Sequence, residues 1–151
     1  QIMNGSDLTV TDPNMTRFMM TLDDAVDLVL YAFKNGENGD LYVQKAPSCS
    51  IEMLANTLIK YYNKQEVKID IIGSRHGEKL YEVLVGSEEM IKSKDLGDFI
   101  LIPPDTRGLS YNQYESKGVI PSENVSDFNS HNCRSLNESE LLELLNKVIT
   151  K

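Results

Sequence analysis

Cysteine is scarce in this chain of 151 residues, which contains only Cys49 and Cys133. Two cysteines make neither a disulfide framework nor a zinc site. We therefore interpret both as reduced thiols of a cytosolic protein. Long apolar runs are also missing, and this argues against a segment that spans a membrane.

Positive charge is in short supply as well. Lysine and arginine number 15 against 23 aspartates and glutamates, which gives a net charge of −8. A protein that binds nucleic acid or an anionic membrane would need a basic face, so the balance argues against both classes. A few well-placed arginines can still hold one anionic ligand, because binding depends on the local field.

The sequence shows no recognisable reaction machinery. It has no Gly-x-Gly-x-x-Gly segment, no phosphate loop and no Gly-x-Ser-x-Gly segment. No tyrosine is followed by a lysine four residues later, and no cluster of histidine and cysteine suggests a metal. We predict no catalytic, cofactor-binding or metal-binding residue in this chain, and we assign no catalytic role to His76 or His131.

The order of the predicted elements is typical of an α/β protein. Runs of β-prone residues predict strands at 8–11, 40–45, 67–72 and 99–102. Capping residues and apolar periodicity predict helices at 21–35, 50–63, 79–85 and 137–149, and a short helix that opens at 87–89. The apolar stripe of the helix that follows Thr21 is so wide that we expect this helix to be heavily buried.

One long segment, 105–135, is polar and rich in glycine, proline, asparagine and serine. It is too long for an ordinary connection, so we expect it to be either functional or mobile. The segment Asn137–Glu140 fits a capping box at the start of the last helix.

Two places in the sequence could hold an anionic ligand. Arg17 lies between a predicted strand and a predicted helix, and a guanidinium forms bidentate bonds with phosphate oxygens. Arg75 and Glu78 flank Gly77 in a loop, where their side chains could converge on one nucleotide. On spacing alone, structural ion pairs explain these residues at least as well.

Four blocks of the sequence carry a resemblance to a known family. They are 9–26, 39–47, 75–82 and 129–132, in this order. Together they resemble bacterial nucleotide-sugar 4,6-dehydratases and epimerases of the extended short-chain dehydrogenase/reductase family. The best match is the CapE-type capsular polysaccharide group, which are UDP-N-acetylglucosamine 4,6-dehydratases that also invert C5. Relatives are often labelled UDP-glucose 4-epimerases.

This resemblance implies an intact enzyme with an N-terminal Rossmann domain that holds NADP and a Tyr-x-x-x-Lys pair. Neither has a counterpart here and the chain does not begin with Met, so we expect a C-terminal fragment. Its expected parts are a remnant of the dinucleotide-binding fold at 1–46 and a small mixed α/β substrate-binding domain at 47–151. The resemblance places the enzyme in the bacterial cytoplasm.

The resemblance also implies roles for particular residues. Arg17 matches the family's first diphosphate-binding arginine, and Arg75 matches the second. Glu78 matches the acidic residue that binds the ribose hydroxyls. The strand Leu8, Thr9 and Val10 matches the one that runs beside the uracil.

Three functions remain open at this stage: the UDP-sugar-binding half of an enzyme, a stand-alone nucleotide-sugar binding module, and a piece that mediates oligomers. We expect that the chain alone neither binds NADP nor turns over a sugar. The predicted strand at 40–45 should pair in the intact enzyme with strands that this chain lacks. An edge strand invites pairing with another chain, so we expect homo-oligomers or strand exchange.

Overall fold

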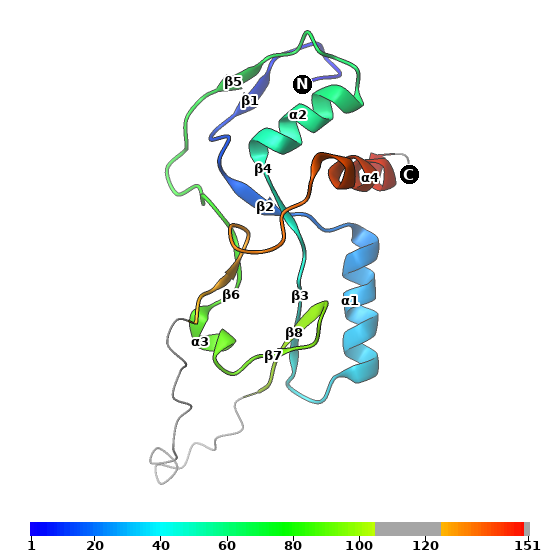
Figure 1. Ribbon diagram of the computed structural model, residues 1–151, viewed down its shortest axis with the longest axis vertical. Helices are drawn as coiled ribbons and strands as arrows, with labels where there is room; N and C mark the ends of the chain where they lie inside the picture. The colour runs from blue at the N-terminus through cyan, green and yellow to red at the C-terminus, as the bar shows by residue number, and fades with distance from the viewer. Residues whose placement is uncertain (105–124, 150–151) are drawn as a thin grey trace. The chain divides into compact units, whose positions relative to one another are not determined.

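The computed structural model describes residues 1–104 and 125–149, which form two compact units (Figure 1). The first unit comprises residues 1–21, 46–82 and the described part of 129–151. The second comprises residues 22–45 and the described part of 83–128. Each unit is therefore built from segments that lie far apart in the sequence. The predicted division of the chain at residue 46 stays a prediction.

The first unit combines two short strand pairs with two helices. Its elements are β1 (Leu8–Val10), β2 (Thr16–Phe18), β4 (Ser48–Ser50), α2 (Ile51–Tyr61), β5 (Ile69–Ile71) and α4 (Glu138–Ile149). Strands β1 and β5 are parallel, whereas β2 and β4 are antiparallel. Helix α2 lies beside both β1 and α4 (Figure 1).

Both helices of the first unit begin where the sequence predicts. The Ser50 hydroxyl accepts a hydrogen bond from the Met53 N–H at 3.1 Å, which satisfies a donor of the first turn of α2. At the start of α4, the Glu140 N–H donates to the Asn137 side chain at 3.0 Å, and the Asn137 N–H donates to the Glu140 carboxylate at 2.9 Å. This reciprocal pair confirms the predicted capping box.

Two apolar clusters stabilise the first unit. One contains Cys49, Leu136, Leu141 and Leu145, and the other contains Ile2, Ile59 and Val67. Cys49 is fully buried, and burial raises the pKa of its thiol to about 11. The thiol is therefore protonated at neutral pH and packs as a small apolar side chain.

The second unit contains a helix beside a three-stranded antiparallel sheet. Its elements are α1 (Leu22–Asn35), β3 (Leu41–Gln44), β6 (Val83–Val85), α3 (Ser87–Met90), β7 (Lys94–Asp95) and β8 (Phe99–Ile102). The sheet has the order β3-β8-β7, and Tyr31 of α1 stacks on Phe99 of β8 with ring centroids 4.2 Å apart. Strand β6 pairs with β9 (Phe128–Asn129), which lies where the two units join in sequence.

Helix α1 occupies the predicted position, but the prediction that it is heavily buried is wrong. No residue of α1 is buried, and Phe33 is 85% exposed. One side of the helix contacts the sheet through Tyr31. The apolar stripe is not covered by any described residue of the same unit and stays exposed. An amphipathic pattern indicates that a face is apolar, but it does not say what covers that face.

The predicted helix at 79–85 is also wrong. The chain there is irregular as far as β6. Gly77 adopts a positive φ of 79°, and the carbonyls of Lys79 and Leu80 accept hydrogen bonds from Arg17 instead of forming helical ones. The β-branched valines of β6 then favour a strand.

Strand β3 pairs with β8 of its own chain, rather than only with strands that the chain lacks. It is the outer strand of the sheet, so its second edge has no partner among the described strands. Of the long polar segment, residues 105–124 lie outside the described residues, and 125–135 carry β9 and a turn. None of the described helices is long and apolar enough to cross a membrane.

The core of the first unit gives a stability prediction. Leu141 is 0% exposed in the cluster between α2 and α4, so Leu141→Ala should lower the free energy of unfolding by about 2–5 kcal/mol. Val148 on the same helix is 52% exposed, and Val148→Ala should change it by less than about 0.5 kcal/mol. Urea unfolding measures both, and equal effects would contradict the assigned core.

Candidate functional site

The predicted site residues all lie in the first unit, around the parallel pair β1 and β5. The carboxyl ends of these strands open into two loops, one beginning at Thr11 and the other spanning residues 73–78. In open α/β sheets, ligands bind outside the carboxyl ends of parallel strands. We call the loop at residues 73–78 the strand-end loop.

Glu78 ties the strand-end loop to the end of β1. One carboxylate oxygen accepts a hydrogen bond from the Thr11 hydroxyl at 2.9 Å, and the other accepts from the Arg75 N–H at 3.1 Å. The Glu78 N–H donates in turn to the Arg75 carbonyl at 3.1 Å. Gly77 provides the left-handed backbone conformation of this turn, which other residues rarely adopt.

Glu78 lies beside the Arg75 backbone and directly before the segment that binds Arg17, and its electrostatics reflect both arginines. The Arg75 N–H and then the Thr11 hydroxyl lower the pKa of the Glu78 carboxyl, although partial desolvation opposes them. The charges of Arg75 and Arg17 lower this pKa further. The Glu78 carboxyl is therefore ionised at neutral pH.

Arg17 projects from β2 and is held by main-chain carbonyl groups. Its guanidinium donates to the Thr16 carbonyl at 2.7 Å, the Lys79 carbonyl at 2.8 Å and the Leu80 carbonyl at 3.4 Å. It forms no ion pair within 4 Å with a carboxylate of the described residues. The alternative of a structural ion pair is therefore not observed in this part of the chain, and its positive charge is fixed in place without a direct counter-ion.

Arg75 has a different environment. Its backbone is held by Glu78, but its side chain is exposed and its guanidinium forms no hydrogen bond or ion pair with a described residue. Lys79, also exposed, lies just beyond the loop. Three cationic side chains, Arg17, Arg75 and Lys79, therefore lie beside the strand-end loop together with the carboxylates of Asp12, Glu78 and Glu82, so this region is not acidic although the chain has a net charge of −8.

The predicted strand Leu8, Thr9 and Val10 forms one side of the site. Val10 is buried and Leu8 is partly buried, whereas Thr9 is exposed. The side-chain amide of Gln1 donates to the Thr9 hydroxyl at 2.9 Å and accepts from the Thr9 N–H at 3.4 Å. Thr9 thus presents a donor and an acceptor side by side, a pair that suits an amide or the edge of a pyrimidine base.

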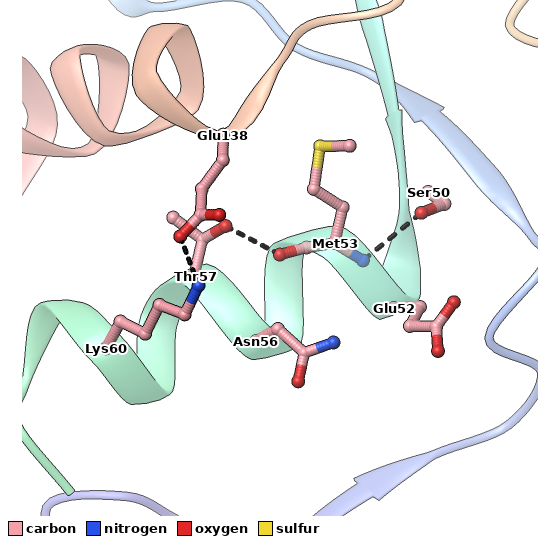
Figure 2. Close-up of a pocket in the computed structure, with 7 residues that line it drawn as sticks. All are labelled: Ser50, Glu52, Met53, Asn56, Thr57, Lys60 and Glu138. Atoms are coloured by element: carbon pink, nitrogen blue, oxygen red, sulfur yellow. Dashed lines mark hydrogen bonds and ion pairs between the residues drawn. The ribbon is translucent and has the colours of Figure 1, made fainter. Parts of the chain in front are cut away.

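A hollow of about 450 Å³ lies elsewhere in the first unit, along α2 (Figure 2). Figure 2 shows its lining residues: Ser50, Glu52, Met53, Asn56, Thr57, Lys60 and Glu138. Several of its polar groups are paired with one another, including Lys60 with Glu138 at 2.5 Å and Thr57 with the Met53 carbonyl at 2.7 Å. None of Arg17, Arg75 and Glu78 lines this hollow, so it is separate from the site.

The described residues do not fit a nicotinamide dinucleotide. Its pyrophosphate is held by a glycine-rich turn that leads from a strand into a helix. Strands β1 and β5 lead into loops and further strands, and β4 passes directly into α2 without a glycine.

Several polar residues of the site were not found by sequence reasoning. Thr11 forms a hydrogen bond with Glu78. Thr16, Glu82 and Ser130 form hydrogen bonds with one another or with Phe18, around the strand that carries Arg17. The hydrogen bond between Thr11 and Glu78 joins residues 67 positions apart, and the one between Thr16 and Ser130 joins residues 114 positions apart. Local sequence patterns carry no signal for contacts of that separation.

The fold and this site define an α/β protein with a cationic loop at the carboxyl ends of two parallel strands. The chain belongs to the polysaccharide biosynthesis protein family, because that family's model matches residues 1–104. A model of the C-terminal region of polysaccharide biosynthesis proteins matches residues 105–150.

Similar proteins agree with this membership. The chain is 51% identical to a UDP-glucose 4-epimerase of Rickettsia bellii over 145 residues, and 50% identical to one of Rickettsia rickettsii. These matches cover 96% of this chain but 42% of each relative, so the chain spans about two fifths of their length. The X-ray structure of Pen from Bacillus thuringiensis matches with a TM-score of 0.75 and 30% identity, over 96% of this chain and 41% of that chain.

These findings confirm the coarser part of the sequence-based prediction, an α/β chain of a polysaccharide-biosynthesis family that resembles nucleotide-sugar enzymes. The relatives carry the name of the alternative activity, a UDP-glucose 4-epimerase, and not that of a 4,6-dehydratase. The roles of Arg17, Arg75, Glu78 and β1 stay predictions.

The hydrogen bond from Thr11 to Glu78 gives a titration prediction. Because the pKa of Glu78 is lowered in the folded chain, its bonds stabilise the fold above the ordinary glutamate pKa, and this contribution is lost as the pH falls through the lowered value. Thr11→Val removes one bond and should raise the pKa of Glu78, as measured by carbon-13 NMR. Glu140, whose pKa is lowered by Asn137 and Arg134, is the internal control and should not move.

Proposed function

We propose that this chain holds the UDP part of a nucleotide-sugar substrate for an enzyme of polysaccharide biosynthesis. One observation carries the proposal: at the carboxyl ends of β1 and β5, Glu78 is bonded to the backbone of Arg75, and the Arg17 guanidinium is bonded to the Lys79 and Leu80 carbonyls that follow Glu78. Two guanidinium groups beside one loop can supply the donors that a diphosphate accepts.

Charge supports the choice of an anionic ligand. The chain as a whole is acidic and repels anions at long range, whereas Arg17, Arg75 and Lys79 lie beside the strand-end loop. A concentrated positive charge within an acidic protein favours a small anion over an extended polyanion such as nucleic acid. A nucleoside diphosphate has the required size and charge.

The residues of the site have different proposed roles in binding the UDP part. Arg75 is exposed and its guanidinium is available to phosphate oxygens, whereas Arg17 is fixed by main-chain carbonyl groups. Glu78 uses each oxygen once to hold the loop, and each carboxylate oxygen has capacity for a second donor, such as a ribose hydroxyl. The donor and acceptor of Thr9 would suit a uracil edge that displaces the Gln1 side-chain amide from them.

Binding the UDP part orients the sugar without touching the atoms that react. Binding energy from a remote part of a substrate can be used to position the reacting part. In enzymes of this kind a nicotinamide cofactor supplies the hydride chemistry. We propose that NADP and the residues of that chemistry belong to protein that this chain, at about two fifths of its relatives' length, does not include.

Two activities of the whole enzyme fit this contribution. The family resemblance of the sequence favours a UDP-N-acetylglucosamine 4,6-dehydratase that inverts C5, and the name of the similar Rickettsia proteins favours a UDP-glucose 4-epimerase. Both activities use a UDP-sugar as substrate. Mass spectrometry of the whole enzyme's product distinguishes them, because dehydration makes the sugar lighter by one water and epimerisation leaves its mass unchanged.

Substitution of Arg75 tests the proposed binding. Arg75→Ala should weaken the binding of UDP to this chain by about 1.5–3 kcal/mol, because a charge-assisted hydrogen bond to phosphate is lost. Isothermal titration calorimetry measures the effect.

The matched control is Arg134→Ala, which removes the same charge from an arginine that pairs with Glu140 instead. Its UDP affinity should equal that of the unchanged chain. If the unchanged chain does not bind UDP, or if the two variants bind it equally well, the proposal is wrong.

A second proposed function, association between copies of the chain, rests on the second unit. Five large apolar side chains of α1 are at least half exposed: Leu22, Val26, Val29, Leu30 and Phe33. The outer strand β3 packs beside this helix and has no described partner on its second edge. Two copies that paired through β3 would extend the sheet and bring their α1 helices together, so we propose a second copy as the occupant of this surface.

This association gives a further prediction. The chain should form dimers or larger species by light scattering, and replacing Leu30 and Phe33 with Gln should make it monomeric, because apolar burial between copies is lost. Val148→Gln, an equally apolar exposed position on α4, should leave the association intact. A monomeric unchanged chain at high concentration would contradict this second function.

A further inference from the structure

The buried hydroxyl of Ser130 lies beside Thr16, the residue before Arg17, and connects three segments of the first unit. The side chain accepts a hydrogen bond from the Glu82 N–H at 2.9 Å and donates to the Thr16 carbonyl at 3.2 Å. It also lies 2.7 Å from the Thr16 hydroxyl. Ser130 is 1% exposed, so each of these bonds is shielded from water.

The main chain of Ser130 is bonded to the same surroundings. Its N–H donates to the Glu82 carbonyl at 2.9 Å, and its carbonyl accepts from the Ser48 hydroxyl at 2.7 Å. Ser130 is therefore held from both sides. A residue with so many buried partners has little freedom, and the groups bonded to it are fixed accordingly.

These groups are the ones that hold Arg17. The Thr16 carbonyl, which accepts from Ser130, also accepts from the Arg17 guanidinium at 2.7 Å. Glu82, which donates to Ser130 through its N–H, accepts from the Phe18 N–H through its carboxylate at 2.9 Å. Ser130 thus links the strand that carries Arg17 to the segment whose Lys79 and Leu80 carbonyls bind the guanidinium.

His131 extends this network to the surface. Its Nδ1 lies 2.9 Å from the Thr16 hydroxyl, and its ring lies against that of Tyr81 with centroids 4.8 Å apart. The distances allow two arrangements of the protons. In the first, the Ser130 hydroxyl donates to the Thr16 carbonyl, the Thr16 hydroxyl donates to the Ser130 hydroxyl, and the His131 Nδ1–H donates to the Thr16 hydroxyl. In the other arrangement Ser130 donates to the Thr16 hydroxyl, which donates to Nδ1. Both arrangements need the Thr16 hydroxyl as the link.

We infer that Thr16 and Ser130 are positioning residues for Arg17 in the diphosphate site, an inference that rests on the proposed function. Neither residue needs to touch the ligand. The Ser130 hydroxyl is bonded to the Thr16 carbonyl, one of the three that accept from the guanidinium, and the Thr16 hydroxyl is bonded to that of Ser130. Because the Nη atoms are engaged by the three carbonyls and the Met15 sulfur, Arg17 presents its remaining donor, the Nε–H, in one orientation. A guanidinium that is already oriented loses less entropy when it binds phosphate.

The test compares UDP with uridine, because uridine lacks the phosphates that Arg17 would bind. Thr16→Val and Ser130→Ala should each lower the affinity for UDP about tenfold, while the affinity for uridine stays unchanged, as measured by NMR titration. Thr16→Ser keeps the hydroxyl and should bind UDP like the unchanged chain. Ser135→Ala removes a neighbouring exposed hydroxyl and is the control.

A purely structural role would give a different result, since loss of the fold would weaken UDP and uridine alike. In an Arg17→Ala background, Thr16→Val should have no further effect on UDP, because the group that it positions is gone. The Arg17 side-chain N–H resonance should also broaden or shift in Thr16→Val and not in Thr16→Ser.

The outcomes separate this inference from the proposed function. If the unchanged chain binds UDP no better than uridine, the proposed function fails and this inference fails with it. If the unchanged chain prefers UDP and both Thr16→Val and Ser130→Ala keep the full preference, the proposed function stands and the positioning role is wrong.

Discussion

The hydrogen bonds from the Arg17 guanidinium to main-chain carbonyl groups are the interaction on which the first unit's site depends. They join β2 to the segment at 79–80, which follows directly on Glu78. Glu78 in turn ties the strand-end loop to Thr11 at the end of β1. Three segments distant in sequence are thereby held together by one cation and one anion.

This arrangement explains how a strongly acidic chain can hold an anion. Main-chain carbonyl groups hold the Arg17 guanidinium, whereas the Arg75 guanidinium is exposed. The Glu78 carboxylate accepts from Thr11 and from the backbone of Arg75, so it shapes the loop as well as reducing its charge. Arg75 is the most accessible of the positive groups.

The sequence predicted much of the regular structure and little of the contact network. Helices α2 and α4 begin where their capping residues predict, because capping is a local interaction. The three-residue strand β2 was missed, since so short a run has no periodicity. The helix expected at 79–85 failed because Arg17, distant in sequence, takes the carbonyls that a helix would use.

The candidate site likewise combines residues that the sequence indicates with residues that it does not. Arg17, Arg75 and Glu78 were recognisable by residue type and by resemblance to a family, and their roles stay predictions. Thr11, Thr16 and Ser130 were not recognisable, because a threonine or serine acquires its role only from distant partners. Helix α1 was misjudged in burial for a related reason: its pattern shows an apolar face and not the surface that covers it.

The most direct measurement is an experimental structure of this chain with UDP bound. We expect the diphosphate at the strand-end loop, with phosphate oxygens about 2.7–2.9 Å from guanidinium nitrogens of Arg75 and Arg17. UDP bound instead in the hollow along α2, beside Lys60, would contradict it.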